Sequence, residues 1–110
     1  MNNEQYAQQV GLAIKEQITL EQFTRLWENS NHDNVVLVRQ QDGIIQTRFH
    51  AKHFWTDTGF KDYELYSFSG GNIGNRNSFT IKGKLLEVTF CEKNIYLLNF
   101  GDTKIAVRLY

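Results

Sequence analysis

The sequence predicts one α+β domain in which two N-terminal helices pack on a curved antiparallel sheet of about six strands in hairpin and meander order. Three observations predict this fold class. Apolar residues recur at helical spacing over roughly the first quarter of the chain, and they alternate with polar residues over most of the remainder. Glycine-containing dipeptides separate several of the alternating segments. The 110 residues suffice for a single domain, residues 1–110, with a substantial core.

Two helices are expected, over residues 3–17 and 20–28. The first segment spaces its apolar residues three and four positions apart. The second begins with a capping box, because the Thr19 hydroxyl and the Gln22 side chain can each satisfy a free backbone N–H group. We expect both helices to cover one face of the sheet. Alternatively, Trp27 on the second helix anchors a partner protein, a role in which tryptophan is common.

Residues 35–41 and 44–50 form the clearest hairpin of the chain. The Asp-Gly dipeptide at 42–43 favours a two-residue type I′ turn between them. This turn fixes the register, so that Val38 faces Thr47 on the side that we assign to the core.

The opposite face of this hairpin gathers three side chains, Arg39, Arg48 and His50. In the simplest interpretation they keep an outer sheet face soluble. In the alternative they form a cationic patch for an acidic protein surface or for phosphate groups, because arginine makes bidentate contacts with carboxylates and phosphates. All three are candidate partner-binding residues.

Residues 51–62 are expected to form a short helical turn followed by a loop. His50, His53 and Asp57 would then share one helix face, a spacing that can hold a metal ion. The segment lacks the His-Glu-x-x-His pattern and the chain lacks a cysteine cluster, so we predict no metal and no cofactor. We expect His53 to be exposed. Trp55 should pack under the sheet or at one end of it, where it is a further candidate contact.

Residues 63–69 and 78–90 are the next two expected strands. The segment 69–78 between them contains three Gly and three Asn, which predicts a mobile loop. In the simplest interpretation it is a plain flexible hairpin loop, and in the alternative it becomes ordered on a partner, with Arg76 at its tip. A phosphate cradle is disfavoured there, because a strand rather than a helix follows the loop. The apolar positions change phase near Gly83, so we expect a bulge or bend at that residue.

Residues 95–100 and 103–110 complete the expected sheet. Glycine first in the dipeptide 101–102 suits a type II′ turn. A three-residue loop at 92–94 brings the preceding strand into phase. The core face then carries Phe90, Tyr96, Leu98, Phe100, Ile105 and Val107.

Composition narrows the classes of function. Basic and acidic residues balance at 12 each, although residues 1–33 hold 2 basic and 5 acidic side chains and the rest holds 10 and 7. The single cysteine, Cys91, excludes an internal disulfide and fits a reducing compartment, and the neighbouring Glu92 disfavours a reactive thiolate. The polar N-terminus and the absence of a long apolar run predict a cytoplasmic protein without a signal peptide or membrane span.

The sequence favours, by elimination, a non-enzymatic protein-binding module. A small bacterial or phage inhibitor, such as a toxin-neutralising immunity protein, would have this character. The expected partner is another protein with an acidic surface, and the expected contact residues are Arg39, Arg48, His50, Trp55 and Arg76. If the outer face of the C-terminal strands is exposed, the interface candidates become Ile95, Leu97 and Ala106.

Two alternatives stay open. One is a small metal-independent nuclease with His50 or His53 as general base and with Lys52 and Arg48 stabilising the phosphorane charge. The missing basic excess argues against a nucleic-acid partner. The other is a cone-shaped small-molecule-binding domain, similar in its order of elements to the nuclear-transport-factor-2-like shape. Its expected lining is Tyr63, Tyr66, Phe68 and Tyr96.

Overall fold

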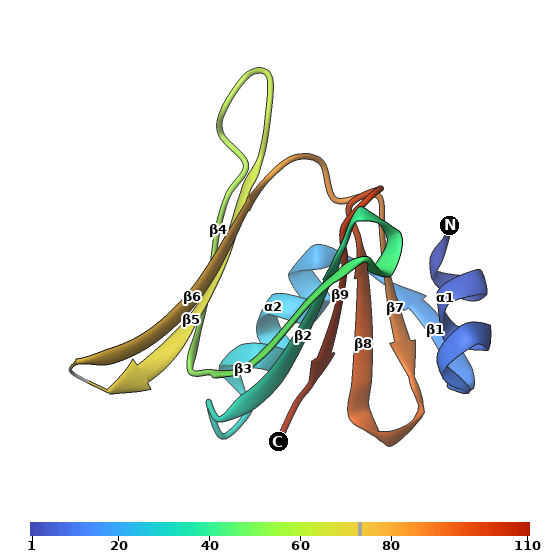
Figure 1. Ribbon diagram of the computed structural model, residues 1–110, viewed down its shortest axis with the longest axis horizontal. Helices are drawn as coiled ribbons and strands as arrows, with labels where there is room; N and C mark the ends of the chain where they lie inside the picture. Colours follow the sequence, from blue (N-terminus) through green and yellow to red (C-terminus); the bar gives the residue numbers. More distant parts are fainter. Residues whose placement is uncertain (73) are drawn as a thin grey trace.

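The computed structural model describes residues 1–72 and 74–110, and it confirms the α+β class. The described residues form two α-helices and nine strands (Figure 1). The helices are α1 (Asn3–Val10) and α2 (Leu20–Glu28). The strands are β1 (Ile14–Ile18), β2 (Asn34–Gln40), β3 (Ile45–Ala51), β4 (His53–Asp57), β5 (Leu65–Asn72), β6 (Asn75–Lys82), β7 (Glu87–Cys91), β8 (Ile95–Asn99) and β9 (Lys104–Arg108).

The described strands pair in two antiparallel sheets, whereas the sequence predicts one sheet of about six strands. Sheet A has the order β1-β7-β8-β9-β2-β3, and sheet B has the order β4-β5-β6. The chain passes from sheet A to sheet B at Lys52, which lies between β3 and β4. The Lys52 N–H group donates a hydrogen bond to the Ser69 carbonyl oxygen on β5 (2.8 Å). Such bends let a continuous segment contribute to two packed sheets.

The first helix is shorter than predicted, because α1 ends at Val10 and residues 14–18 form strand β1. Gly11 caps the helix in the left-handed conformation with φ +73°, which glycine adopts without strain. Residues 14–18 then pair with β7, with Ile18 opposite Val88. The helical prediction for these residues was wrong because pairing with a distant strand outweighed a weak local helical pattern.

The two helices lie on opposite faces of sheet A, which corrects the prediction that both cover one face. Tyr6 of α1 packs in a cluster with Leu97, whereas Phe23 of α2 packs in a cluster with Leu98. Consecutive strand residues point to opposite faces, so the two clusters occupy opposite sides of β8. Trp27 belongs to the cluster of Phe23 and Leu98 and is only 3% exposed, so its alternative role as a partner anchor is wrong.

Helix α2 lies in the angle between the two sheets (Figure 1). The Phe23 ring lies 5.2 Å from the ring of Phe54 on β4 and 5.6 Å from the ring of Tyr96 on β8. The Trp27 ring lies 5.7 Å from the ring of Phe68 on β5. One aromatic cluster therefore joins α2 to both sheets and forms the centre of the core.

The predicted hairpin registers are confirmed. Val38 pairs with Thr47 across β2 and β3, and Tyr96 pairs with Val107 across β8 and β9. The connection at 41–43 is a 3₁₀ turn with positive φ at all three residues, rather than a two-residue turn, but the register is unchanged.

The predicted C-terminal core face is confirmed as well. The three-residue connection at 92–94 forms as expected. Four of the predicted core residues are buried: Tyr96, Leu98, Ile105 and Val107. The other two, Phe90 and Phe100, are partly buried and pack against the core.

The predicted long strand 78–90 is instead two strands in different sheets. Strand β6 ends at Lys82 and belongs to sheet B, and β7 begins at Glu87 and belongs to sheet A. The phase change near Gly83 therefore marks a crossing between sheets rather than a bulge within one strand. Leu86 lies in the connection and is 63% exposed.

Two predicted irregular segments are also strands. Residues 53–57 form β4 rather than a helical turn, because Phe54 and Thr56 pair with Phe68 and Tyr66 in sheet B. The predicted mobile loop 69–78 is mostly paired backbone, since β5 and β6 continue their register to Asn72 opposite Asn75. Residue 73, within that predicted loop, lies outside the described residues.

Candidate functional site

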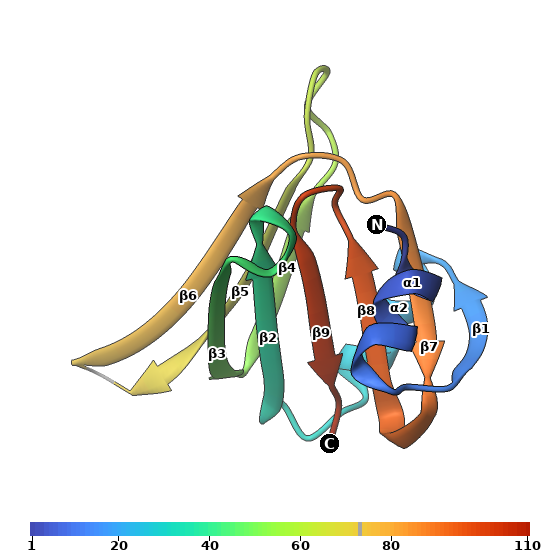
Figure 2. The ribbon, with the colours of Figure 1, turned by 45° about the vertical axis from the view of Figure 1, so that its right-hand side comes forward.

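The outer face of sheet A, defined as the face on which α1 packs, is only partly covered. Figure 2 shows α1 lying over β8 and β7, while β9, β2 and β3 remain open beside it. On the open strands, Arg48 pairs with Leu37, and Leu37 pairs with Ala106. Two residues further along each strand, and so on the same face, His50 pairs with Val35. These registers place basic and apolar side chains side by side on one rigid surface.

A shallow groove of about 200 Å³ lies on this face. We call it the outer groove, and its lining is Val35, Leu37, Arg48, Ile95, Ala106 and Arg108. The aliphatic members are half-buried, with Ile95 and Ala106 packed against the cluster that contains Tyr6 of α1, and both arginines are exposed. The Arg108 guanidinium lies over the ring of Tyr110, with its central carbon 5.3 Å from the ring centroid. The described lining contains no carboxylate, so the groove joins an apolar floor to a cationic rim.

Arg39 shares this face but has a different environment from Arg48. Its guanidinium carbon lies 5.1 Å from the centroid of the Tyr6 ring of α1. Burial raises the pKa of the Tyr6 phenol, and the Arg39 charge partly opposes that shift. The Arg39 Nε is buried without a hydrogen-bond partner among the described residues. Arg39 is therefore held against α1 at the side of the outer groove.

His50 lies on the same face, at the edge strand β3. Its Nδ1 is 3.5 Å from the Asp33 Oδ1, and both side chains are exposed. The sequence prediction grouped His50 with two arginines as a cationic patch, but the Asp33 carboxylate offsets any positive charge on this imidazole.

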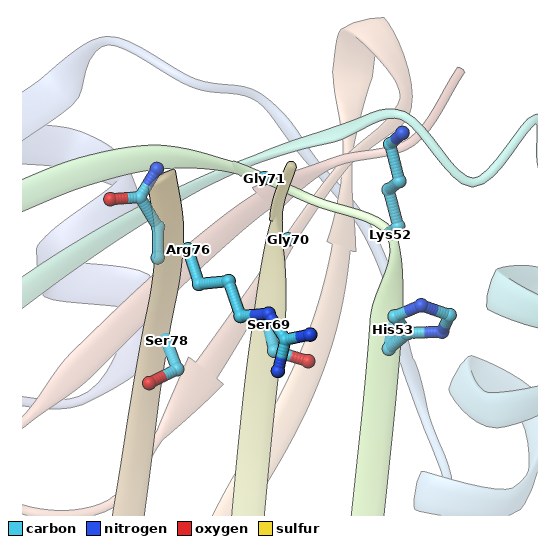
Figure 3. A pocket seen from close by; sticks show the side chains of 8 residues that line it. Lys52, His53, Ser69, Gly70, Gly71, Arg76 and Ser78 are labelled. Atoms are coloured by element: carbon cyan, nitrogen blue, oxygen red, sulfur yellow. The ribbon is translucent and has the colours of Figure 1, made fainter. Parts of the chain in front are cut away.

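A second surface feature lies at the corner between the sheets. We call it the corner cleft; its volume is about 520 Å³ and its lining is Lys52, His53, Ser69, Gly70, Gly71, Arg76, Asn77 and Ser78. Figure 3 shows the Arg76 side chain crossing β5 to end beside Ser69, with His53 on the neighbouring strand β4. His53, Ser69 and Ser78 form one register row across β4, β5 and β6.

Trp55 lies on the same face of sheet B as His53, two residues further along β4. It is 52% exposed and pairs with Ser67, so it does not pack under the sheet as predicted. The predicted contact residues therefore divide into two surfaces. Arg39, Arg48 and His50 lie on the outer face of sheet A, whereas Trp55 and Arg76 lie on sheet B.

The structure brings together only part of the nuclease alternative. Lys52 and His53 line the corner cleft, whereas Arg48 and His50 lie outside that lining and His50 is paired with Asp33. The expected helical spacing of His50 and Asp57 is lost because both lie on strands. Within residues 1–72 and 74–110, no three His, Cys, Asp or Glu side chains gather as a metal site.

Buried aromatics fill the region where the small-molecule alternative places a cone. Tyr66, Phe68 and Tyr96 are each at most 3% exposed and belong to the packed interior.

Cys91 is buried too, and burial together with the Glu92 carboxylate raises the pKa of its thiol. A thiol in this state is a poor nucleophile.

Sequence reasoning missed Arg108 as a member of the surface. The turn residues paired Arg108 with Ile95 correctly. Its approach to Arg48 depends on the adjacency of β9 and β2, two strands far apart in the chain. No local turn signal encodes that adjacency, although the shared apolar alternation of both strands permits it.

No protein-family model, no curated protein and no solved structure matches the chain. Among the described residues, no helix combines the length and apolar character needed to cross a membrane.

Proposed function

We propose that the chain is a non-enzymatic protein-binding module whose outer groove docks on an acidic surface of another protein. An inhibitor of bacterial or phage type, such as a toxin-neutralising immunity protein, acts in this way. The observation that carries the proposal is the apolar floor of the groove, which is flanked by Arg48 and Arg108 and lined by no described carboxylate.

The apolar floor supplies the part of the interface that gains from burial. Leu37 and Ala106 are neighbours in register on adjacent central strands, so the floor is rigid before any partner arrives. Removal of apolar area from water favours association, and a preformed surface loses little conformational entropy on binding.

The arginines supply orientation and choice of partner. Guanidinium groups at the margin of an apolar patch favour carboxylates on the partner and repel basic proteins. Arginine is also among the residues enriched in interface hot spots. Arg39 supports the surface from the α1 side, and His50 extends it towards the edge strand.

Charge reversal tests the proposal. Immobilised wild-type chain and the double variant Arg48→Glu/Arg108→Glu are incubated with lysate of cells that express the protein, and retained proteins are identified by mass spectrometry. We expect an acidic protein to bind the wild type and its affinity for the double variant to fall about a hundredfold or more, because like charges then face each other. Its affinity for the wild type should also weaken as salt increases.

Lys84→Glu is the matched control, since Lys84 is exposed in the connection between β6 and β7 and outside the outer groove. This variant should retain the partner. Urea unfolding of each variant checks that the fold survives. If the double variant folds and still binds the partner with unchanged affinity, the outer groove is not the docking surface.

A further inference from the structure

The corner cleft is a second, independent concentration of ligand-binding groups. It is lined by Lys52 at the corner and by residues of the three strands of sheet B, whereas the outer groove lies on sheet A. The two linings share no residue. An inference from the cleft therefore does not depend on the proposed protein-binding function.

The lining of the cleft has the chemistry of an oxyanion site. Lys52, His53 and Arg76 approach from the corner, from β4 and from β6, and Asp and Glu are absent from the described lining residues. Among residues 1–72 and 74–110, ion pairs form between His50 and Asp33 and between Lys104 and Asp42, and neither pair includes Lys52, His53 or Arg76. Basic side chains that line one cleft without a nearby carboxylate favour a bound anion.

The other lining residues supply neutral hydrogen-bond donors and leave space for a ligand. Ser69 and Ser78 face each other in register on the same sheet face as His53, and a serine hydroxyl can donate to a phosphate oxygen. Gly71, on the same face of β5 as Ser69, has no side chain, so a ligand can approach the β5 backbone there. Figure 3 shows the Arg76 guanidinium beside Ser69, where both could contact the same oxyanion.

An aromatic surface lies next to these donors. Trp55 follows His53 on the same strand face at a separation of roughly 6.6 Å along the strand. Its ring is 52% exposed, and the two neighbouring positions in its row are the small residues Ser67 and Thr80. A flat ligand can therefore lie on the indole, and stacking on an aromatic face stabilises a nucleic-acid base by about 1–3 kcal/mol.

We propose that the corner cleft binds the phosphate group of a nucleotide through Arg76 and Ser69, with Lys52 and His53 at its margin, and that the base stacks on Trp55. A nucleotide carries a phosphate and a planar base separated by one sugar, which matches the order of these groups along β4. The balanced net charge of the chain favours a mononucleotide over a polynucleotide.

Titration of the full chain with a nucleoside 5′-monophosphate tests this site. Tryptophan fluorescence and isothermal calorimetry should both show saturable binding, with fluorescence quenched as the base covers Trp55. Arg76→Gln should weaken binding at least about tenfold, because it removes a charge-assisted contact with the phosphate. Trp55→Phe should abolish most of the quenching while calorimetry still detects phosphate binding.

Three comparisons complete the experiment. The nucleoside without phosphate should bind at least about tenfold more weakly than the nucleotide, and inorganic phosphate should compete with the nucleotide. Arg48→Gln, on the outer face of sheet A, should leave nucleotide affinity unchanged. The proposal is overturned if neither nucleotide nor phosphate binds, if Arg76→Gln has no effect on affinity, or if only an oligonucleotide binds. None of these outcomes bears on the pull-down through the outer groove.

Discussion

Asn3 is a fully buried polar residue at the start of α1, and it determines how the helix docks on sheet A. Its Nδ2 donates to the Leu97 carbonyl oxygen (3.0 Å) and to the Thr89 hydroxyl oxygen (3.0 Å). The neighbouring Asn2 is exposed and caps the same helix through its side chain. Adjacent asparagines therefore serve different purposes, one in tertiary docking and one in local helix capping.

Replacing Asn3 with aspartate should separate these two purposes. Asn3→Asp keeps the shape but places an acceptor against the Leu97 carbonyl oxygen, so we expect a loss of about 1–3 kcal/mol in the free energy of unfolding. Urea denaturation measures this loss, and hydrogen exchange should show weaker protection of α1. Asn2→Asp is the control, because aspartate caps a helix as well as asparagine does. Equal stability of the two variants would contradict the docking role.

Strand β5 approaches the end of β3 so closely that a side chain cannot fit between them. A Cβ atom on Gly70 would lie 2.2 Å from the His50 carbonyl oxygen and 3.0 Å from the Ala51 Cα. Both are backbone atoms, so they can yield only if the corner between the sheets opens. The glycine at this position therefore sets the angle at which sheet B leaves sheet A.

Gly70→Ala should consequently destabilise the corner. We expect the free energy of unfolding to fall by about 1–3 kcal/mol, which is the usual range for an overpacked site. Thermal and urea unfolding report the change. Gly83→Ala provides the comparison, since a Cβ atom there meets nothing within 4 Å and Gly83 is not among the residues with positive φ. It should alter stability by no more than about 0.5 kcal/mol. A loss as large for Gly83→Ala as for Gly70→Ala would rule out the steric explanation.

Elements were predictable from sequence where the signal is local. Turn residues at 42–43, 92–94 and 101–102 fixed three registers, because the number of turn residues decides which strand positions face each other. The strand character of 14–18 and 53–57 was not predictable in this way. Each of these segments is a strand because it pairs with a partner far along the chain, and local spacing carries no information about that partner.

The division of the candidate contacts between two surfaces belongs to the whole molecule. Sequence alternation identified the shared face of Arg39, Arg48 and His50, and the hairpin register confirms it. It did not show that Trp55 and Arg76 lie on another sheet, because the change of sheet at Lys52 has no turn dipeptide to mark it. The position of that corner determines which candidate residues can act together.

Buried phenols make the stability of the whole molecule sensitive to alkaline pH. The Tyr66 hydroxyl donates to the Glu64 Oε1 (3.0 Å), and the Tyr96 hydroxyl donates to the Asn94 Oδ1 (2.9 Å). Burial raises both pKa values above the ordinary 10.0, with the Glu64 hydrogen bond and charge adding to the shift at Tyr66 and the Glu16 charge adding at Tyr96. In the folded state both phenols therefore hold their protons at a pH where the unfolded chain has released them.

The sign of the pH dependence follows from this difference in proton binding. The stabilising contribution is complete below pH 10 and is lost as the pH rises through the folded pKa values, so the free energy of unfolding should fall above pH 10. Tyr66→Phe should lose about 0.5–1.5 kcal/mol at pH 7 through the missing hydrogen bond. The deficit of this variant relative to wild type should then shrink above pH 10, because phenylalanine cannot ionise. Urea unfolding of both proteins from pH 7 to pH 11 measures the difference, which should stay constant up to about pH 9. A deficit that remained constant up to pH 11 would show that the Tyr66 phenol titrates alike in both states.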